Sequence, residues 1–199
     1  MKILVTGFDP FGGEKVNPAW EAVSRLPEQL GEHQLIRMMV PTSFERAPQM
    51  ILEKAALCRP DYVISIGQAA GRTAITPERI AINMMSASIA DNDGDMPQEQ
   101  KIESDGPDGY FSLLPVLKMV HAIEAAGLPG KISNTAGTFV CNRVMYSLLH
   151  ACHTCFPGMK SGFIHVPCIP EQRVAHPEWF ALPVEEITKG LAAAITAIE

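Results

Sequence analysis

Short runs of consecutive apolar residues constrain the fold more than any other feature of this sequence. Most of them are apolar at every position instead of alternating, which is typical of strands in a sheet that is buried on both faces. The runs that we interpret as strands are residues 2–6, 35–40, 62–66, 80–83, 131–133 and 162–166.

Helical patterns, with apolar residues every three or four positions, lie between these runs. They cover residues 44–57, 113–126, 140–155 and 184–198. Strands that alternate with helices favour a mostly parallel, twisted sheet with helices on both faces. The predicted class is therefore α/β, a three-layer α/β/α sandwich. A chain of 199 residues has a length typical of one domain, so we expect residues 1–199 to form a single domain.

Charge and cysteine content narrow the choice of partners and compartment. The net charge is −6, and the Lys and Arg residues are scattered, whereas nucleic acids and anionic membranes require a concentrated basic face. No stretch approaches the ~20 apolar residues of a membrane span, and the first apolar run is too short for the core of a signal peptide. Five unevenly spaced cysteines do not resemble a disulfide framework. We expect a cytoplasmic protein with reduced thiols that binds neither nucleic acid nor membranes.

Two loops are candidates for function. Residues 6–13, TGFDPFGG, leave the first predicted strand, where ligands bind in open α/β sheets. Their glycines match neither G-x-G-x-x-G nor G-x-x-x-x-G-K-[ST], which argues against a nucleotide site. Phe8 and Phe11 either line a small uncharged pocket or close the core over the end of the sheet. Residues 90–110 form a long polar loop that suits a lid or an interface arm.

A cysteine and a histidine are predicted to meet at one edge of the sheet. Cys141 lies at the start of the helical pattern after SNTAGTFV, where free backbone N–H groups and the helix dipole stabilise a thiolate and an oxyanion. His165 ends the run Phe163-Ile164-His165 near the end of the strand-like segment GFIHV and offers an imidazole as base and acid. The alternatives are a packed core cysteine and a core histidine satisfied by a backbone carbonyl.

The third member of such a site is an acid that orients the imidazole. Glu78 lies at the start of an apolar run and either has this role or forms a salt bridge with Arg72 or Arg79. Cys152 and Cys155 have C-x-x-C spacing but come late in a predicted helix, and no second ligand pair accompanies them. We therefore assign both to helix packing and predict neither a metal site nor a cofactor.

Several long motifs, in order and spread over nearly the whole chain, resemble one family. They are TGFDPFGG with NPAWEAV, SIGQAAGR, ITPERIAIN, GPDGYFS, SNTAGTFVCN with MY, and GFIHVPCIPEQ. Together they resemble the pyroglutamyl peptidase I family, which are cytosolic cysteine peptidases that remove an N-terminal pyroglutamate.

The resemblance implies roles for particular residues. Cys141 is the implied nucleophile, His165 the base and Glu78 the acid that orients it. Phe8 and Phe11 would flank the lactam ring of a peptide with an N-terminal pyroglutamate, Gln68 would hydrogen-bond that ring, and the chain would form a homotetramer.

The sequence departs from the family pattern after PERIAIN. Ser88 stands where the family commonly has an arginine that the resemblance places near the active site. Either a cation is missing there or another, such as Arg143, compensates. Two other functions remain as alternatives: a small-molecule-binding protein in which Cys141 is merely packed, and another hydrolase or phosphorylase on a similar sheet.

Overall fold

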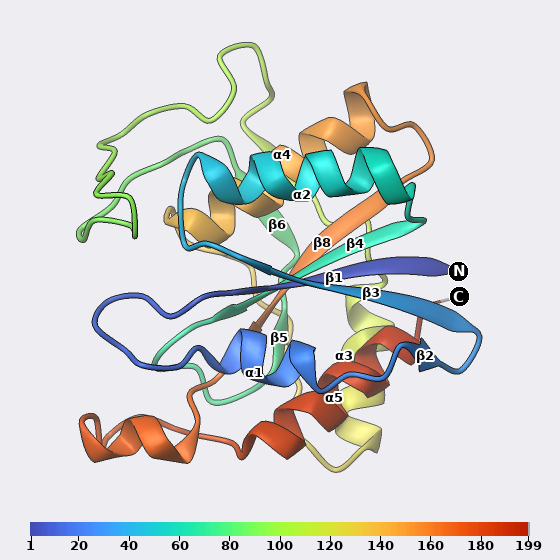
Figure 1. The fold of residues 1–199 in the computed structure, drawn as a ribbon, viewed down its shortest axis with the longest axis vertical. Helices are drawn as coiled ribbons and strands as arrows, with labels where there is room; N and C mark the ends of the chain where they lie inside the picture. Colours follow the sequence, from blue (N-terminus) through green and yellow to red (C-terminus); the bar gives the residue numbers. More distant parts are fainter. Residues whose placement is uncertain (199) are drawn as a thin grey trace.

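A computed structural model describes residues 1–198. Its centre is a six-stranded sheet in the order β2-β3-β1-β4-β8-β5 (Figure 1). The four middle strands run parallel, and the two short edge strands, β2 and β5, pair antiparallel with their neighbours. The strand bounds are β1 Lys2–Phe8, β2 Gln29–Leu30, β3 His33–Val40, β4 Tyr62–Gln68, β5 Thr76–Pro77 and β8 Lys160–Val166.

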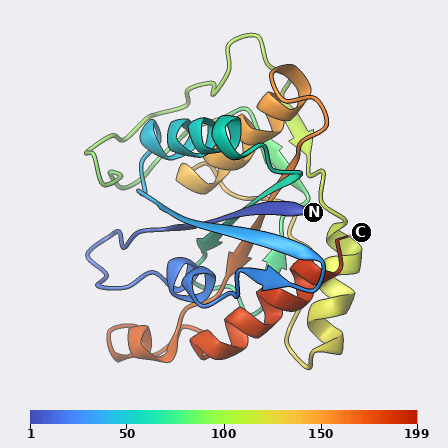
Figure 2. The same cartoon turned by 45° about the vertical axis from the view of Figure 1, so that its right-hand side comes forward.

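Helices cover both faces of this sheet. In Figures 1 and 2, helices α2 and α4 lie on one side of the strands, and α1, α3 and α5 lie on the other. Their bounds are α1 Pro18–Ser24, α2 Arg46–Cys58, α3 Val116–Ala125, α4 Val140–Thr154 and α5 Val184–Thr196, with a short 3₁₀ helix at Pro170–Val174. The predicted α/β class with a mostly parallel sheet between helical layers is confirmed.

The uninterrupted apolar runs follow from these two layers. In β1, Ile3 and Val5 join the core beneath α1, α3 and α5, whereas Leu4 and Phe8 join the core beneath α2 and α4. Because successive residues of a strand point to opposite faces, a strand covered on both sides needs apolar residues at every position.

Two elements differ from the sequence-based expectation. Residues 131–133 form no strand; Ser133 makes a single bridge to Glu78. The apolar periodicity did not predict helix α1. Its start is marked by Asn17, which caps the helix by accepting the N–H of Ala19 at 3.0 Å, and by Pro18 in the first turn.

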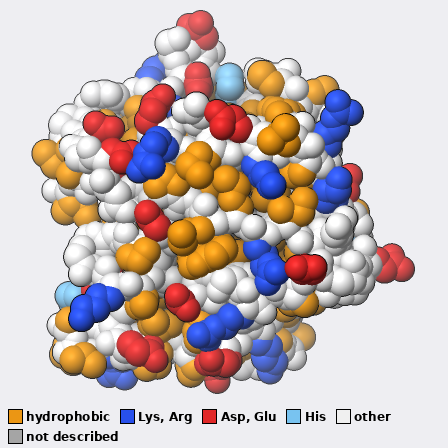
Figure 3. All heavy atoms as spheres, in the orientation of Figure 1, with side chains coloured by type: hydrophobic (Ala, Val, Ile, Leu, Met, Phe, Trp, Pro, Cys, Tyr) orange, Lys and Arg blue, Asp and Glu red, His pale blue; other side chains and the backbone are white. Residues whose placement is uncertain are grey.

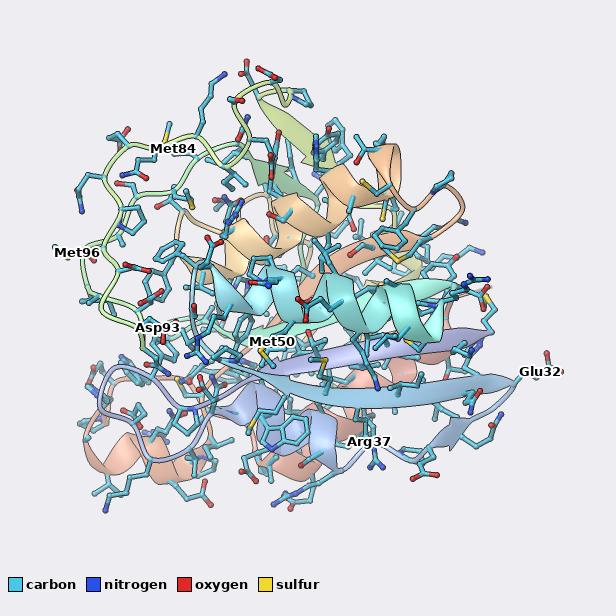
Figure 4. The ribbon with its side chains drawn as sticks, turned by 45° about the horizontal axis from the view of Figure 1, so that its top comes forward. Glu32, Arg37, Met50, Met84, Asp93 and Met96 are labelled. Atoms are coloured by element: carbon cyan, nitrogen blue, oxygen red, sulfur yellow. The ribbon has the colours of Figure 1, made fainter. Side chains whose placement is uncertain are left out.

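The long polar loop is folded against the start of α2. The buried carboxylate of Asp91 accepts the backbone N–H of Phe44 at 2.8 Å, and Arg46 forms two hydrogen bonds of 2.6 and 2.7 Å with Asp93. Figure 4 shows Asp93 on the loop beside the start of α2. The end of the loop forms β7, Gly109–Phe111, which pairs with β6, Ile80–Ile82, in a separate two-stranded sheet. None of the helices in residues 1–198 has the length and apolarity to cross a membrane.

Candidate active site

Cys141 lies in the first turn of α4, above the carboxyl end of β4. A Cβ atom placed on Gly67 would come within 2.9 Å of the Cys141 Sγ, so the sulfur rests directly over the strand backbone. Gly67 is also the register partner of His165 on the neighbouring strand β8. The missing side chain at position 67 therefore allows the thiol to reach the strand pair that carries the imidazole.

His165 is oriented by a buried carboxylate. Its Nδ1 lies 2.7 Å from the Oε1 of Glu78, which is 0% exposed. The backbone N–H of Glu78 donates to the carbonyl oxygen of Phe163 at 2.9 Å and so fixes the acid beside β8. An imidazole that donates its Nδ1–H to the carboxylate presents an unprotonated Nε2, the form that a general base requires.

Arg72 completes the charge balance of the site. Its Nη2 lies 3.0 Å from the same Glu78 oxygen and donates to the carbonyl oxygen of Thr135 at 2.9 Å, while Nη1 donates to Thr76 at 3.1 Å. The two roles that the sequence left open for Glu78 therefore coexist. The buried oxygen Oε1 of Glu78 therefore lies next to both an imidazole and a guanidinium, the kind of partners that a buried carboxylate requires.

Burial sets the resting protonation of the pair. The pKa of the Cys141 thiol is raised to about 12, first by burial and then by the negative charge of Glu78, against the lowering influence of Arg72 and of the backbone N–H of Cys141. Burial also lowers the pKa of His165, against the opposing influence of Glu78. Burial thus opposes the expected stabilisation of a thiolate by the helix N-terminus, and it favours the neutral forms of both the thiol and the imidazole.

A pocket of about 190 Å³ opens onto the thiol and the imidazole. Its size suits one small ring, and none of the described residues that line it is acidic or basic apart from His165. Phe8, Phe11 and Gln68, the three residues predicted for substrate binding, are all part of its wall. The remaining lining residues are Asn17, Thr42, Ala136, Phe139, Val140, Cys141 and His165.

The two phenylalanines contribute differently. Phe8 is 2% exposed and belongs to the core under α2 and α4, so it both closes the core and forms the floor of the pocket. Phe11 lies on the loop after β1, with its ring centroid 6.2 Å from that of Phe139. Phe139, which sequence reasoning missed, lies two residues before Cys141 in the same motif.

Four other sequence candidates lie away from this pocket. Arg143 donates to the carbonyl oxygen of Phe44 at 3.2 Å and lines a separate hollow, so it does not supply a cation to the thiol. Ser88 is exposed. Cys152 packs in the core as expected, but Cys155 is exposed, which corrects its assignment to packing. Within residues 1–198, no cluster of three or more His, Cys, Asp or Glu has the geometry to hold a metal ion.

A larger hollow of about 810 Å³ lies between the loop after β1 and the 3₁₀ helix. Neither cysteine nor histidine is among the described residues that line it. Nucleophilic and acid–base chemistry therefore point to the smaller pocket.

Comparison with known proteins gives one consistent result. The sequence model of the pyroglutamyl peptidase family matches residues 1–199. The pyrrolidone-carboxylate peptidase of Lactobacillus acidophilus is 51% identical over 199 residues, which are 99% of this chain and 98% of the relative. That of Staphylococcus haemolyticus is 52% identical over 198 residues, 100% of this chain and 93% of the relative.

Solved structures agree with the sequence relatives. The crystal structure of pyroglutamyl peptidase I from Bacillus amyloliquefaciens is similar with a TM-score of 0.95 and 44% identity, covering 98% of this chain and 94% of that one. A mutant pyrrolidone carboxyl peptidase from the hyperthermophile Pyrococcus furiosus has a TM-score of 0.94 and 38% identity, covering 100% of this chain and 98% of that one.

Proposed function

This chain belongs to the pyroglutamyl peptidase family, and we propose that Cys141, His165 and Glu78 carry out its hydrolysis of the bond after an N-terminal pyroglutamyl residue. The resemblance stated from the motifs is confirmed, and the chain is a cysteine-type hydrolase. One observation supports the assignment of residues most strongly. Cys141 and His165 face the same ring-sized pocket, and Glu78 lies 2.7 Å behind the imidazole.

The first half of the reaction forms an acyl-enzyme. His165 Nε2 takes the thiol proton while Cys141 Sγ attacks the carbonyl carbon of the pyroglutamyl residue. The resulting oxyanion lies near the start of α4, where Arg143 is the first residue to donate within the helix, to the carbonyl of Phe139. The N–H groups before it have no partner within the helix and can stabilise the negative oxygen. The imidazolium then protonates the leaving amine, and a thioester remains.

Water completes the cycle. His165, neutral again, takes a proton from a water molecule that attacks the thioester, and it returns the proton to the departing sulfur of Cys141. Glu78 stabilises the imidazolium in both halves without becoming protonated. Pyroglutamate is released, and the enzyme recovers its neutral thiol.

The pocket supports selection for an uncharged ring. Phe8 and Phe11 offer apolar walls, and Gln68 offers a hydrogen bond to the lactam. An uncyclised N-terminus would bring an ammonium into a pocket whose described lining has no carboxylate. The desolvation cost of a few kcal/mol corresponds to roughly a hundredfold or more in specificity.

The proposal also covers the domain organisation, oligomeric state, location and partners of the chain. We propose that residues 1–199 are one catalytic domain that forms a homotetramer, which the family resemblance implies. All five cysteines are free, which supports a reducing cytoplasmic location. Charges of both signs are interspersed over the face in Figure 3, which argues against a nucleic-acid partner. The proposed mechanism uses no metal or organic cofactor.

The direct test is hydrolysis of matched fluorogenic amides. The pyroglutamyl amide of 7-amino-4-methylcoumarin should be cleaved, and a thiol reagent should abolish cleavage. The glutaminyl, glutamyl and prolyl amides should have kcat/KM values lower by about a hundredfold or more. EDTA should leave the rate unchanged. Comparable kcat/KM for the pyroglutamyl and glutaminyl amides would refute the pocket assignment, and zinc-dependent recovery after EDTA would refute the metal-free mechanism.

A further inference from the structure

A chain of hydrogen-bonded side chains runs from the wall of the 190 Å³ pocket towards the larger hollow between the loop after β1 and the 3₁₀ helix. It begins at Gln68 on the end of β4 and continues to Gln172 in the 3₁₀ helix, which is 3% exposed. It ends at Glu14 in the loop after β1. Neither Gln172 nor Glu14 is among the residues to which the sequence assigned a function.

The orientation of the Gln172 amide is fixed at both of its ends. Its Nε2 donates to Oε2 of Glu14 at 3.2 Å, and its Oε1 accepts the backbone N–H of Ile169 at 3.2 Å. An ionised carboxylate only accepts hydrogen bonds, and a backbone N–H only donates. The amide of Gln172 therefore has one orientation that satisfies both neighbours.

This orientation in turn fixes the amide of Gln68. The Gln68 Nε2 donates to Oε1 of Gln172 at 3.0 Å and to Sγ of Cys168 at 3.2 Å, which uses both amide hydrogens. The Gln68 Oε1 receives a longer bond of 3.4 Å from Gln172. Because an amide oxygen has two lone pairs, Gln68 keeps one acceptor position free. Gln68 is partly buried and lines the pocket that holds Cys141.

We propose that Gln172, held by Glu14, is a positioning residue that locks the Gln68 amide with its oxygen available to the pocket. This inference rests on the proposed function. It makes the ring N–H of the lactam the hydrogen-bond partner of the Gln68 side-chain oxygen. The site then selects a ring that donates at that position and discriminates against a lactone, in which an oxygen replaces the N–H. A Gln68 amide released from Gln172 would also adopt the orientation that presents its NH₂ group to the ring N–H, and this selection would weaken.

The hydrogen bond between Glu14 and Gln172 also connects the two walls of the pocket. The backbone N–H of Glu14 donates to the carbonyl oxygen of Phe11 at 3.2 Å in a turn of the loop after β1. The carboxylate that orients Gln172 thus lies on the same turn as the aromatic wall of the pocket. Placement of the ring by Phe11 and reading of its N–H by Gln68 are therefore coupled.

The test compares two substrates on each enzyme preparation. The pyroglutamyl amide of 7-amino-4-methylcoumarin supplies the lactam, and the amide of 5-oxotetrahydrofuran-2-carboxylic acid supplies the matching lactone. The ratio of their kcat/KM values is independent of the fraction of folded enzyme. Wild type should favour the lactam by about a hundredfold, and Gln172→Met should reduce this preference by about three- to tenfold, the contribution of one neutral hydrogen bond.

A double variant provides the matched control. Glu14→Gln combined with Gln172→Glu exchanges the two side chains: the carboxylate at position 172 accepts from Gln68 and Ile169, and the amide at position 14 donates to it. This exchange should keep the wild-type ratio. Glu171→Gln, which removes an exposed neighbouring charge, should also keep it.

The outcomes separate this proposal from the proposed function. An unchanged ratio in Gln172→Met, or a loss of preference in the exchanged double variant as large as in Gln172→Met, would overturn the positioning role. A wild-type enzyme that cleaves the lactam no better than the lactone would overturn the assignment of the ring N–H to Gln68. A wild-type enzyme that cleaves neither amide would refute the proposed function itself.

Discussion

Gly67 offers the sharpest test of where the nucleophile lies. An alanine Cβ at this position would come within 2.9 Å of Cys141 Sγ and 2.8 Å of Phe163 Cζ, whereas ordinary contact begins at 3.4 Å. The sulfur must therefore move by about half an ångström. Since a displacement of ~1 Å can reduce the rate ~100-fold, we expect Gly67→Ala to lower kcat about tenfold. Crowding of Phe163 should also cost about 1–3 kcal/mol of stability.

The two effects can be separated experimentally. Phe163→Leu removes the ring atom that would clash, so Gly67→Ala combined with Phe163→Leu should recover Tm relative to Gly67→Ala, by about 2–4 °C per kcal/mol regained. It should not recover kcat, because the contact with Cys141 remains. Phe163→Leu alone is the reference, since this ring also contacts His165 at a centroid distance of 4.8 Å. Wild-type kcat in Gly67→Ala, or full recovery of kcat in the double variant, would refute the placement of the sulfur.

Three further substitutions test the catalytic groups. Cys141→Ala should abolish turnover of the pyroglutamyl amide while preserving the circular dichroism spectrum; retained hydrolysis would remove the mechanism. Glu78→Gln should lower kcat by about 10²–10⁴ through loss of the correct tautomer, and it should move the acid limb of kcat to lower pH, because Glu78 raises the pKa of His165. Arg72→Gln should move that limb to higher pH and slow alkylation of Cys141 by iodoacetamide at pH 7, because Arg72 lowers the pKa of both groups; shifts in the opposite directions would contradict the assignments.

Acid stability adds a fourth measurement. Because burial lowers the pKa of His165 in the folded protein, the unfolded chain takes up this proton first as the pH falls. Its contribution to stability should be present above the unfolded pKa of about 6.5 and be lost below it. Denaturant titrations between pH 7 and 5 should show this loss, and a smaller one in His165→Gln. Equal slopes in the two proteins would indicate that His165 is not buried as a neutral group.

The sequence predicts best the strands whose identity depends only on burial on both faces of the sheet. Strands β1, β4 and β8 are apolar on both faces, so their identity follows from composition with little dependence on their neighbours. The start of α4 at Val140 also agrees with the periodicity. Residues 131–133 fail for a physical reason. The N–H groups of Lys131 and Ser133 do donate to the carbonyl oxygens of Ile75 and Pro77 at 3.1 and 3.0 Å, but the bridges at Gly130 and Ser133 are not adjacent, so the pairing does not extend into a regular strand.

The candidate site shows a different limit of sequence reasoning. Charge patterns present salt bridge and catalytic orientation as alternatives for Glu78, yet one oxygen of this carboxylate forms an ion pair with Arg72 at 3.0 Å and a hydrogen bond with His165 at 2.7 Å. The protonation of Cys141 is also decided by packing. The helix N-terminus favours a thiolate, but the amount of burial that opposes it depends on how β4 and β8 enclose the sulfur.

Burial of a neutral pair has a consequence for how the reaction is driven. Among the described residues, Glu78 and Arg72 form an ion pair of 3.0 Å behind the imidazole. In the proposed mechanism, attack of the Cys141 sulfur on the substrate carbonyl creates two new charges together, an imidazolium on His165 and an oxyanion on the substrate. The imidazolium forms beside the Glu78 carboxylate, and the oxyanion forms at the free N–H groups of α4, so each arises next to a group that is already oriented. A resting ion pair would gain part of this stabilisation before substrate binds, and that part could not lower the barrier. A thiol whose pKa is raised in this way therefore leaves the electrostatics of the site available to the transition state.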